Sequence, residues 1–259
     1  MVFGANLLQP LNFIMRKLTV IQVLILSSLI IFSDYALADE VIKKDNVDYK
    51  LTLSYYSTKE SQANDVNMRA SRANQTVWVG YYRETQGKFD QFRAGYERTD
   101  QIPFTKIVSS FQVADHGFLG LSETAEIGVP FFALVGYGRT NLKPYNNINF
   151  DPNDAITYGI GWRGEDDTSI SLYSVRDVRI IPGQRITHLF LRKSITDSQR
   201  ITIDIFNKTG PNDDMGKSIN ATGTAITYDV SRYFLRFAYE PKVNFSQENM
   251  TRISTGVRF

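Results

Sequence analysis

The chain contains no cysteine among its 259 residues, which excludes a disulfide framework and cysteine-ligated metal sites. Only two histidines are present, His116 and His188, and the sequence holds neither a Gly-x-Ser-x-Gly nor a His-Glu-x-x-His motif. We therefore predict no catalytic residues, no metal site, no cofactor and no enzymatic activity.

The chain has almost no net charge, and it has no long apolar run outside its first residues. The formal net charge is +2, and it falls to +1 once a leader carrying Arg16, Lys17 and Asp34 is removed, which gives no case for nucleic-acid binding. After that leader, no apolar run is long enough to cross a bilayer as a helix. Any insertion into a membrane must then use a closed barrel of strands. Apart from a helix, only a closed barrel pairs every backbone N–H and C=O group by hydrogen bonds within the protein.

The leader has the three regions of a secretory signal peptide. Arg16 and Lys17 are followed by the apolar run Leu18–Phe32 and by Ala36-Leu37-Ala38, a site of small residues suited to cleavage. We predict cleavage after Ala38, which leaves residues 39–259 as a single domain, and translation starting at Met15 is an alternative to Met1. A permanent membrane anchor is disfavoured, because the apolar run is shorter than the roughly 20 residues that a spanning helix needs.

Alternation of apolar and polar residues predicts strands throughout the rest of the chain. In Val47–Ser57, for example, Tyr49, Leu51 and Leu53 fall on one face, and polar residues fall on the other. Thr58–Asn74 is polar and predicts a loop, and Phe104–Ile127 fits either one long bulged strand or a hairpin. We expect an all-β antiparallel barrel of about twelve strands, with ten and fourteen as alternatives.

The final segment, Asn249–Phe259, carries the most specific signal. Thr251, Ile253, Thr255, Val257 and Phe259 share one face of an amphipathic strand. This ending resembles the C-terminal assembly signal of Gram-negative outer-membrane β-barrels. The resemblance implies a transmembrane barrel in the cell outer membrane, surrounded by lipid, with Phe259 presented to the barrel-assembly machinery. We expect such a barrel to be a monomer.

Barrels of this class have short turns at the periplasmic end and longer loops outside. The predicted connections alternate in the same way. They are short at Gln86, Glu165, Asp197 and Ser231, and long at Thr58, Asn141, Lys208 and Pro241.

If the Phe259 face meets lipid, the opposite face lines the lumen and carries more arginines than carboxylates. The functional interpretation is a narrow pore or uptake channel for small, in particular anionic, solutes. The alternative is a network of ion pairs that fills a narrow barrel. The predicted lumen residues are Arg93, Glu97, Arg163, His188, Arg192, Asp204, Asp229, Arg236, Glu240, Arg252 and Arg258.

Two further functions stay open at this point. One is a structural or surface-interaction barrel that acts through the predicted loops Thr58–Asn74, Asn141–Asp154 and Lys208–Ser218. The more distant one is a lipid-modifying enzyme, for which Ser194 would have to form a pair with His188. The two residues are six positions apart on one strand face, too far for a hydrogen bond at about 3.3 Å per residue. Acidic loop residues at 149–154 and 212–214 do not match a calcium-binding motif, and turn formation explains them.

Overall fold

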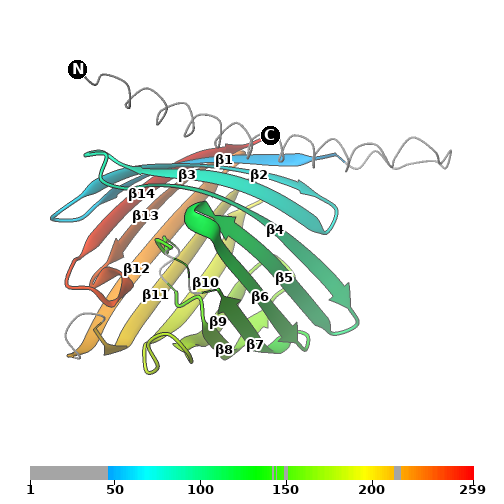
Figure 1. Cartoon of the computed structure of the whole chain (residues 1–259). Helices are drawn as coiled ribbons and strands as arrows, with labels where there is room; N and C mark the ends of the chain where they lie inside the picture. Colours follow the sequence, from blue (N-terminus) through cyan, green and yellow to red (C-terminus); the bar gives the residue numbers. More distant parts are fainter. Residues whose placement is uncertain (1–45, 142, 144, 149–150, 213–216) are drawn as a thin grey trace, which may run out of the picture. The chain divides into compact units, whose positions relative to one another are not determined.

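Fourteen antiparallel strands form one closed barrel in the computed structural model (Figure 1). The structure describes residues 46–259 apart from 142, 144, 149–150 and 213–216, so the predicted leader and its cleavage site lie outside the described residues. The strands are β1 (Asp48–Ser57), β2 (Gln62–Arg72), β3 (Gln75–Glu84), β4 (Asp90–Ile102), β5 (Thr105–Ala114), β6 (Phe118–Ile127), β7 (Phe131–Thr140), β8 (Ala155–Arg163), β9 (Ser169–Asp177), β10 (Arg185–Thr196), β11 (Gln199–Pro211), β12 (Ser218–Val230), β13 (Tyr233–Glu240) and β14 (Met250–Arg258).

Each strand pairs with its neighbours in sequence, and β1 closes the barrel against β14. The closing register runs from Lys50 opposite Arg258 to Ser57 opposite Thr251. Two backbone hydrogen bonds between Tyr49 and Phe259, of 2.8 and 3.0 Å, extend this ladder by one pair. The two rings stack with centroids 5.6 Å apart. Closure leaves no open sheet edge, which is the condition for a sheet to lie in lipid.

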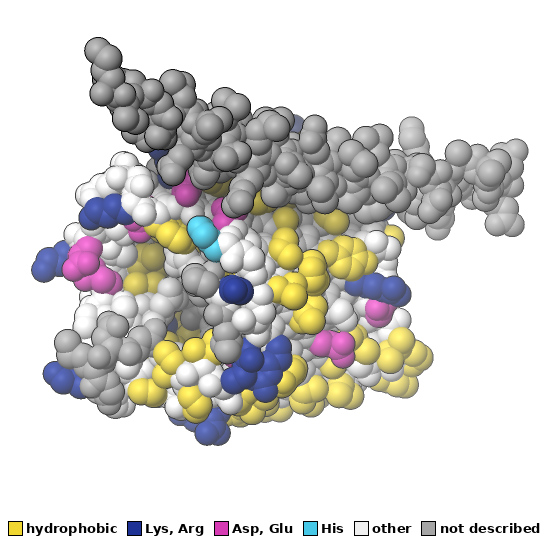
Figure 2. All heavy atoms as spheres, in the orientation of Figure 1, with side chains coloured by type: hydrophobic (Ala, Val, Ile, Leu, Met, Phe, Trp, Pro, Cys, Tyr) yellow, Lys and Arg dark blue, Asp and Glu magenta, His cyan; other side chains and the backbone are white. Residues whose placement is uncertain are grey.

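The outer surface of the barrel is apolar. Side chains at alternate strand positions point outward, and large hydrophobic residues among them stay well exposed, such as Leu53 at 47%, Ile160 at 66% and Leu235 at 57%. Figure 2 shows hydrophobic side chains gathered over one face of the barrel. A surface of this kind requires a lipid environment. Among the described residues, no helix has the length and apolar character that a membrane crossing would need.

The fourteen-strand alternative is confirmed, and the main expectation of twelve strands was wrong for two reasons. Thr58–Asn74 is not a loop, because most of it forms β2. The outward positions of β2 include the polar Gln62 and Asn64 besides Val66 and Met68, and its inward positions include the apolar Ala63, which hides the apolar alternation. Phe104–Ile127 is a hairpin rather than one bulged strand. Its strands β5 and β6 meet at the short helix η1 (Asp115–Gly117), where His116 has a positive φ of 65°.

These two errors also changed the assignment of connections to the barrel ends. The end that holds Asp48 and Phe259, named the turn end, has the connections 73–74, 103–104, 128–130, 164–168, 197–198 and 231–232. The opposite end, named the loop end, has 58–61, 85–89, 115–117, 141–154, 178–184, 212–217 and 241–249. Gln86 therefore lies at the loop end, and the connection at Thr58 is short. Likewise, the predicted loop Lys208–Ser218 begins in a strand, since β11 continues to Pro211.

Candidate functional site in a divided lumen

The predicted lumen residues all occupy inward-facing strand positions. Several of them form ion pairs with residues that the sequence analysis did not single out. On one wall, Arg93 on β4 donates to Asp65 on β2 at 2.6 Å, and both side chains are buried. Nearby, Glu97 accepts from Arg69 at 3.0 Å. Asp65 and Arg69 were missed because both belong to the strand mistaken for a loop.

A second group of pairs connects the remaining strands. Arg163 pairs with Glu126, which also lies 3.4 Å from Lys106. Asp229 pairs with Arg258 and lies 3.5 Å from Arg200. Most inward carboxylates are thus already matched with a cation.

Glu240 has an unexpected partner, because it pairs with Lys208 rather than with an arginine. Both side chains are almost fully buried, and the Lys208 ammonium also donates to the carbonyl of Lys242 at 3.2 Å. The ring of Phe245 lies 5.8 Å from the same ammonium. Lys208 was predicted at the start of a surface loop, and the structure places it in the interior instead.

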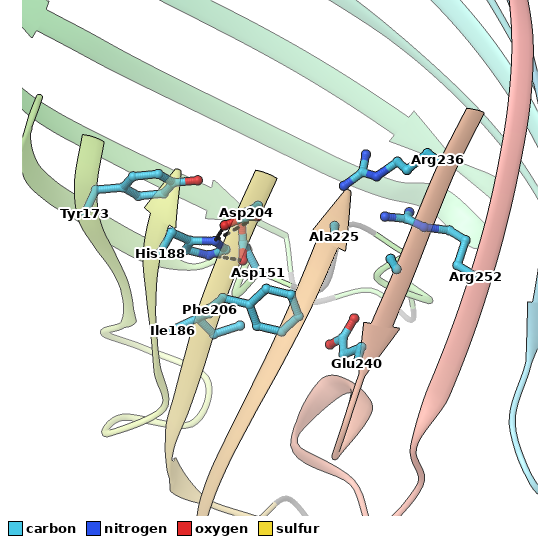
Figure 3. A pocket seen from close by; sticks show the side chains of 11 residues that line it. Asp151, Tyr173, Ile186, His188, Asp204, Phe206, Ala225, Arg236, Glu240 and Arg252 are labelled. Carbon is cyan, nitrogen blue, oxygen red and sulfur yellow. Dashed lines mark hydrogen bonds and ion pairs between the residues drawn. The ribbon is translucent and has the colours of Figure 1, made fainter. Parts of the chain in front are cut away.

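Some cations have no carboxylate partner within the described part of the chain. Neither Arg236 on β13 nor Arg192 on β10 forms an ion pair there, and the same holds for Lys50 on β1. Lys50 lies 4.5 Å from the centre of the Phe234 ring, and Arg192 lies 5.5 Å from that of Phe190. Arg252 on the neighbouring β14 lies beside Arg236, and both guanidinium groups point into one cavity (Figure 3). The interior therefore keeps a basic wall after its carboxylates have been paired.

The connection between β7 and β8 covers residues 141–154, and its described residues fold into the lumen. Tyr145 stacks on Phe118 with ring centroids 3.9 Å apart and accepts a hydrogen bond from Gln112. Burial raises the pKa of the Tyr145 phenol, so this group stays a neutral hydrogen-bonding partner. Ile148 is buried in an apolar cluster with Tyr56 and other inward residues. The polar composition of this segment suggested a surface loop, but its Tyr and Ile were signals of an inward position.

The base and far part of this inward loop are held by charged groups. Asp154 is fully buried near its end and accepts from the Arg179 Nε at 2.6 Å. Asp151 reaches the wall at β10, where its Oδ1 lies 3.2 Å from Nε2 of His188. The other ring nitrogen of His188, Nδ1, lies 3.0 Å from Asp204 on β11, and the imidazole stacks on Tyr173 (Figure 3). His188 thus connects the loop to the barrel wall.

The inward loop separates two cavities. The smaller, of about 200 Å³, contains His188, Asp204, Arg236 and Arg252 in its lining. The larger, of about 360 Å³, has Arg69, Trp78, Arg93 and Glu97 among its lining residues. Asp151 lines both cavities. Trp78 lies flat on the wall because Gly95 has no side chain, since a Cβ there would come within 2.4 Å of the indole.

A second connection also covers the loop end of the lumen. The short helix η2 (Val243–Phe245) in the connection between β13 and β14 buries Phe245 against Ile186, Phe206 and Ile219. Together with the inward loop, this contact narrows the lumen above the basic wall.

The chemistry around His188 does not resemble a hydrolytic centre. Both ring nitrogens face carboxylates, so neither is free to take a proton from a nucleophile. Among its described lining residues, the smaller cavity includes no serine or threonine. Within the described ranges, no group of His, Asp or Glu side chains has the arrangement that would hold a metal ion. Asn149, Asp213 and Asp214 lie outside the described residues.

Comparisons with known proteins place the chain by fold. No family model and no curated protein matches the sequence. Among solved structures, the outer membrane protein Omp33 of Acinetobacter baumannii has a TM-score of 0.54 at 10% identity, with 82% of this chain and 98% of that chain covered. OccAB3 of Acinetobacter baumannii has a TM-score of 0.46 at 7% identity, covering 84% and 100% of the two chains. OmpF of Salmonella typhi, in complex with daunomycin, has 0.45 at 9%, covering 83% and 97%.

At such identities the likeness concerns the fold alone. The closed barrel, its apolar exterior and its polar lumen are the features of an outer-membrane β-barrel. The chain is therefore an outer-membrane β-barrel of Gram-negative type.

Proposed function

We propose that this protein is a narrow channel for small solutes and that it favours anions. The observation that carries the proposal is Arg236, which has no carboxylate partner in the described part of the chain and lines the smaller cavity. A guanidinium group in a confined, low-dielectric space attracts anions and repels cations. Lys50 and Arg192 add to the same excess of positive charge.

The pairing pattern argues against a lumen that is filled by ion pairs throughout. Salt bridges do occupy the wall around Arg93 and the space below Phe245, where Lys208 meets Glu240. Between them, however, the two cavities persist on either side of the inward loop. We infer that solutes pass through these spaces and that the inward loop limits their size.

The structure offers less support for a barrel that acts through its loops. Of the three segments predicted to form that surface, the first is mostly strand β2, the second folds inward, and much of the third is strand. A surface-binding function would therefore depend on little projecting chain. For a lipid-modifying activity, the described lining of the cavity around His188 includes no serine or threonine that could serve as the nucleophile.

Conductance in planar bilayers tests the proposal. We expect purified protein to give discrete current steps, with a reversal potential in a KCl gradient that indicates preference for chloride. Arg236→Glu should shift this potential toward cation preference, because it exchanges an unpaired positive charge in the cavity for a negative one.

The matched control is Arg83→Glu, which makes the same charge change at an exposed, outward-facing position on β3. Its reversal potential should equal that of the unaltered protein. Folded protein that gives no steps would contradict the channel, and an equal shift in both variants would show that the charge in the cavity has no special role.

A further inference from the structure

A carboxylate interrupts the apolar outer surface of the barrel. Glu123 on β6 points outward between Leu121 and Ala125 and is exposed. Ser109 on β5, its partner in the strand register, donates a long hydrogen bond of 3.5 Å to its carboxylate. Figure 2 shows acidic side chains among the hydrophobic ones on the face that it displays. The proposed channel does not use this outer face.

Glu123 lies too far from the strand ends to reach the aqueous boundary easily. It is four residues from Ile127, the last residue of β6 at the turn end. With about 3.3 Å per residue and a tilt of about 40°, this places Glu123 about 10 Å inside that end of the strand, within an apolar band about 25 Å tall. Its outward neighbours Leu121, Phe111 and Val135 are exposed apolar side chains, at 56%, 41% and 45%.

An ionised group at such a depth is unfavourable against lipid and marks a functional contact. Ser109 donates one hydrogen bond to the carboxylate of Glu123, and the surrounding hydrocarbon can donate none. A protein surface with a complementary charge would remove this cost.

The barrel itself carries such a charge on the same rung of the sheet. Arg98 on β4 is paired in register with Ser109, which is paired with Glu123, so the three residues form an outward row across β4, β5 and β6. Arg98 lies 2.9 Å from Asp100, and its side chain is 53% exposed. We name Arg98, Asp100, Ser109 and Glu123 the outer polar strip. It contains both signs of charge and is therefore complementary to itself.

We propose that the outer polar strip is the contact surface with a second copy of this chain. A two-fold axis along the membrane normal, passing near Ser109, would place β4 of one copy against β6 of the other and keep both copies at the same depth. Arg98 of each copy then faces Glu123 of the other. Two strand spacings of about 4.8 Å at a tilt of about 40° separate the two residues by about 6 Å in height, within reach of two long side chains.

Charge complementarity favours a second copy over other occupants. Anionic lipid headgroups would be repelled by Glu123 and Asp100. An unrelated protein would need its own cation at matching depth, whereas the strip already supplies one. This proposal replaces the expectation of a monomer and is independent of solute passage.

The absence of native cysteine makes a direct test available. A Ser109→Cys variant carries the only thiol of the chain, located beside the proposed axis. After mild oxidation in intact membranes, we expect a disulfide-linked band at twice the mass of one chain. The control is Leu235→Cys, which is 57% exposed in the native protein and lies on β13 on the far side of the barrel, and it should stay monomeric.

Glu123→Gln tests the charge independently and keeps the size of the side chain. We expect it to lower the dimer fraction of the purified protein in native mass spectrometry, while the heat-modifiable mobility of the folded barrel is retained. Cross-linking at Ser109→Cys no stronger than at Leu235→Cys would overturn the proposal, as would a product whose mass indicates a different protein. A dimer fraction unchanged in Glu123→Gln would overturn the role of the Arg98–Glu123 contact.

Discussion

Nε2 of His188 on the barrel wall lies 3.2 Å from Oδ1 of Asp151 in the inward loop. This contact joins residues 37 positions apart and spans the boundary between the two cavities. The loop has other anchors elsewhere along it: Tyr145 on Phe118, Ile148 in the apolar cluster with Tyr56, and Asp154 with Arg179. His188 and Asp151 therefore hold the part of the loop that leads into β8 against β10.

Replacing Asp151 by Asn should loosen the inward loop. A hydrogen bond to a charged group contributes about 1.5–3 kcal/mol, so the loop should leave its position about ten to a hundred times more often. We expect larger and noisier current steps in planar bilayers. Asp197→Asn, in a turn at the opposite end, is the control and should behave like the unaltered protein. Steps of unchanged size and noise in Asp151→Asn would mean that the contact does not hold the loop.

Breaking the pair of Lys208 and Glu240 should cost more than removing both partners. Lys208→Met leaves an unpaired carboxylate in a site with almost no solvent access, and the expected loss is about 3–5 kcal/mol in the free energy of unfolding. The double variant Lys208→Met, Glu240→Leu should recover most of this loss. Urea unfolding in detergent micelles measures all three proteins. A double variant no more stable than Lys208→Met would rule out a direct electrostatic pairing.

Gly95→Ala should displace Trp78 from the wall of the larger cavity. The added Cβ would lie 2.4 Å from the indole, and such overpacking costs about 1–3 kcal/mol. In a background where the only other tryptophan, Trp162, is replaced by Phe, we expect altered Trp78 fluorescence and a lower unfolding midpoint. Gly120→Ala is a matched inward-facing control, because its Cβ would have no neighbour closer than 3.4 Å. Equal spectra for the two variants would contradict this prediction.

Phe259→Ala should reduce assembly more than stability. Phe259 is 61% exposed, and its ring stacks only on Tyr49 among the described residues, whereas its backbone hydrogen bonds survive the substitution. We expect less heat-modifiable protein in the outer membrane, with an unfolding midpoint close to that of the unaltered barrel. Tyr49→Ala removes the same stacking without altering the proposed signal. Equal assembly defects in the two variants would assign the effect to the stacking.

Protein isolated from outer-membrane fractions should begin at Asp39. The basic residues, the apolar run and the small residues at 36 and 38 predict cleavage after Ala38. Intact-mass measurement decides this directly. A mass that retains Leu18–Phe32 would indicate an uncleaved anchor.

Much of the barrel could be predicted because one physical pattern repeats along it. Wherever the outward face is apolar, as in β1 or β14, alternation alone identified the strand and its lumen side. The pattern failed at β2, where the polar Gln62 and Asn64 face outward and the apolar Ala63 faces inward. It also failed at Lys208, whose burial depends on Glu240 and Phe245, residues distant in sequence.

The inward loop marks the other limit of sequence reasoning. Its position depends on contacts with Phe118, His188 and Tyr56, which lie on three separate strands. No local periodicity encodes such contacts. For the same reason, the sequence could not predict which lumen charges pair with each other. Alternation along each strand could still indicate which positions face the lumen.

The seam between β1 and β14 also has a consequence for the order in which the protein folds. Every other ladder joins strands adjacent in sequence, so it closes a short stretch of chain at small entropic cost. The seam instead joins residues as far apart as Ser54 and Ser254, 200 positions away, whose hydroxyls meet at 2.8 Å. Hairpins can therefore form one after another along the chain. The edge strand β1, however, cannot pair with β14 until β14, the last strand of the chain, is in place. During that interval both edges offer unpaired backbone groups, and a chaperone or an assembly factor that covers them would determine the yield of the barrel.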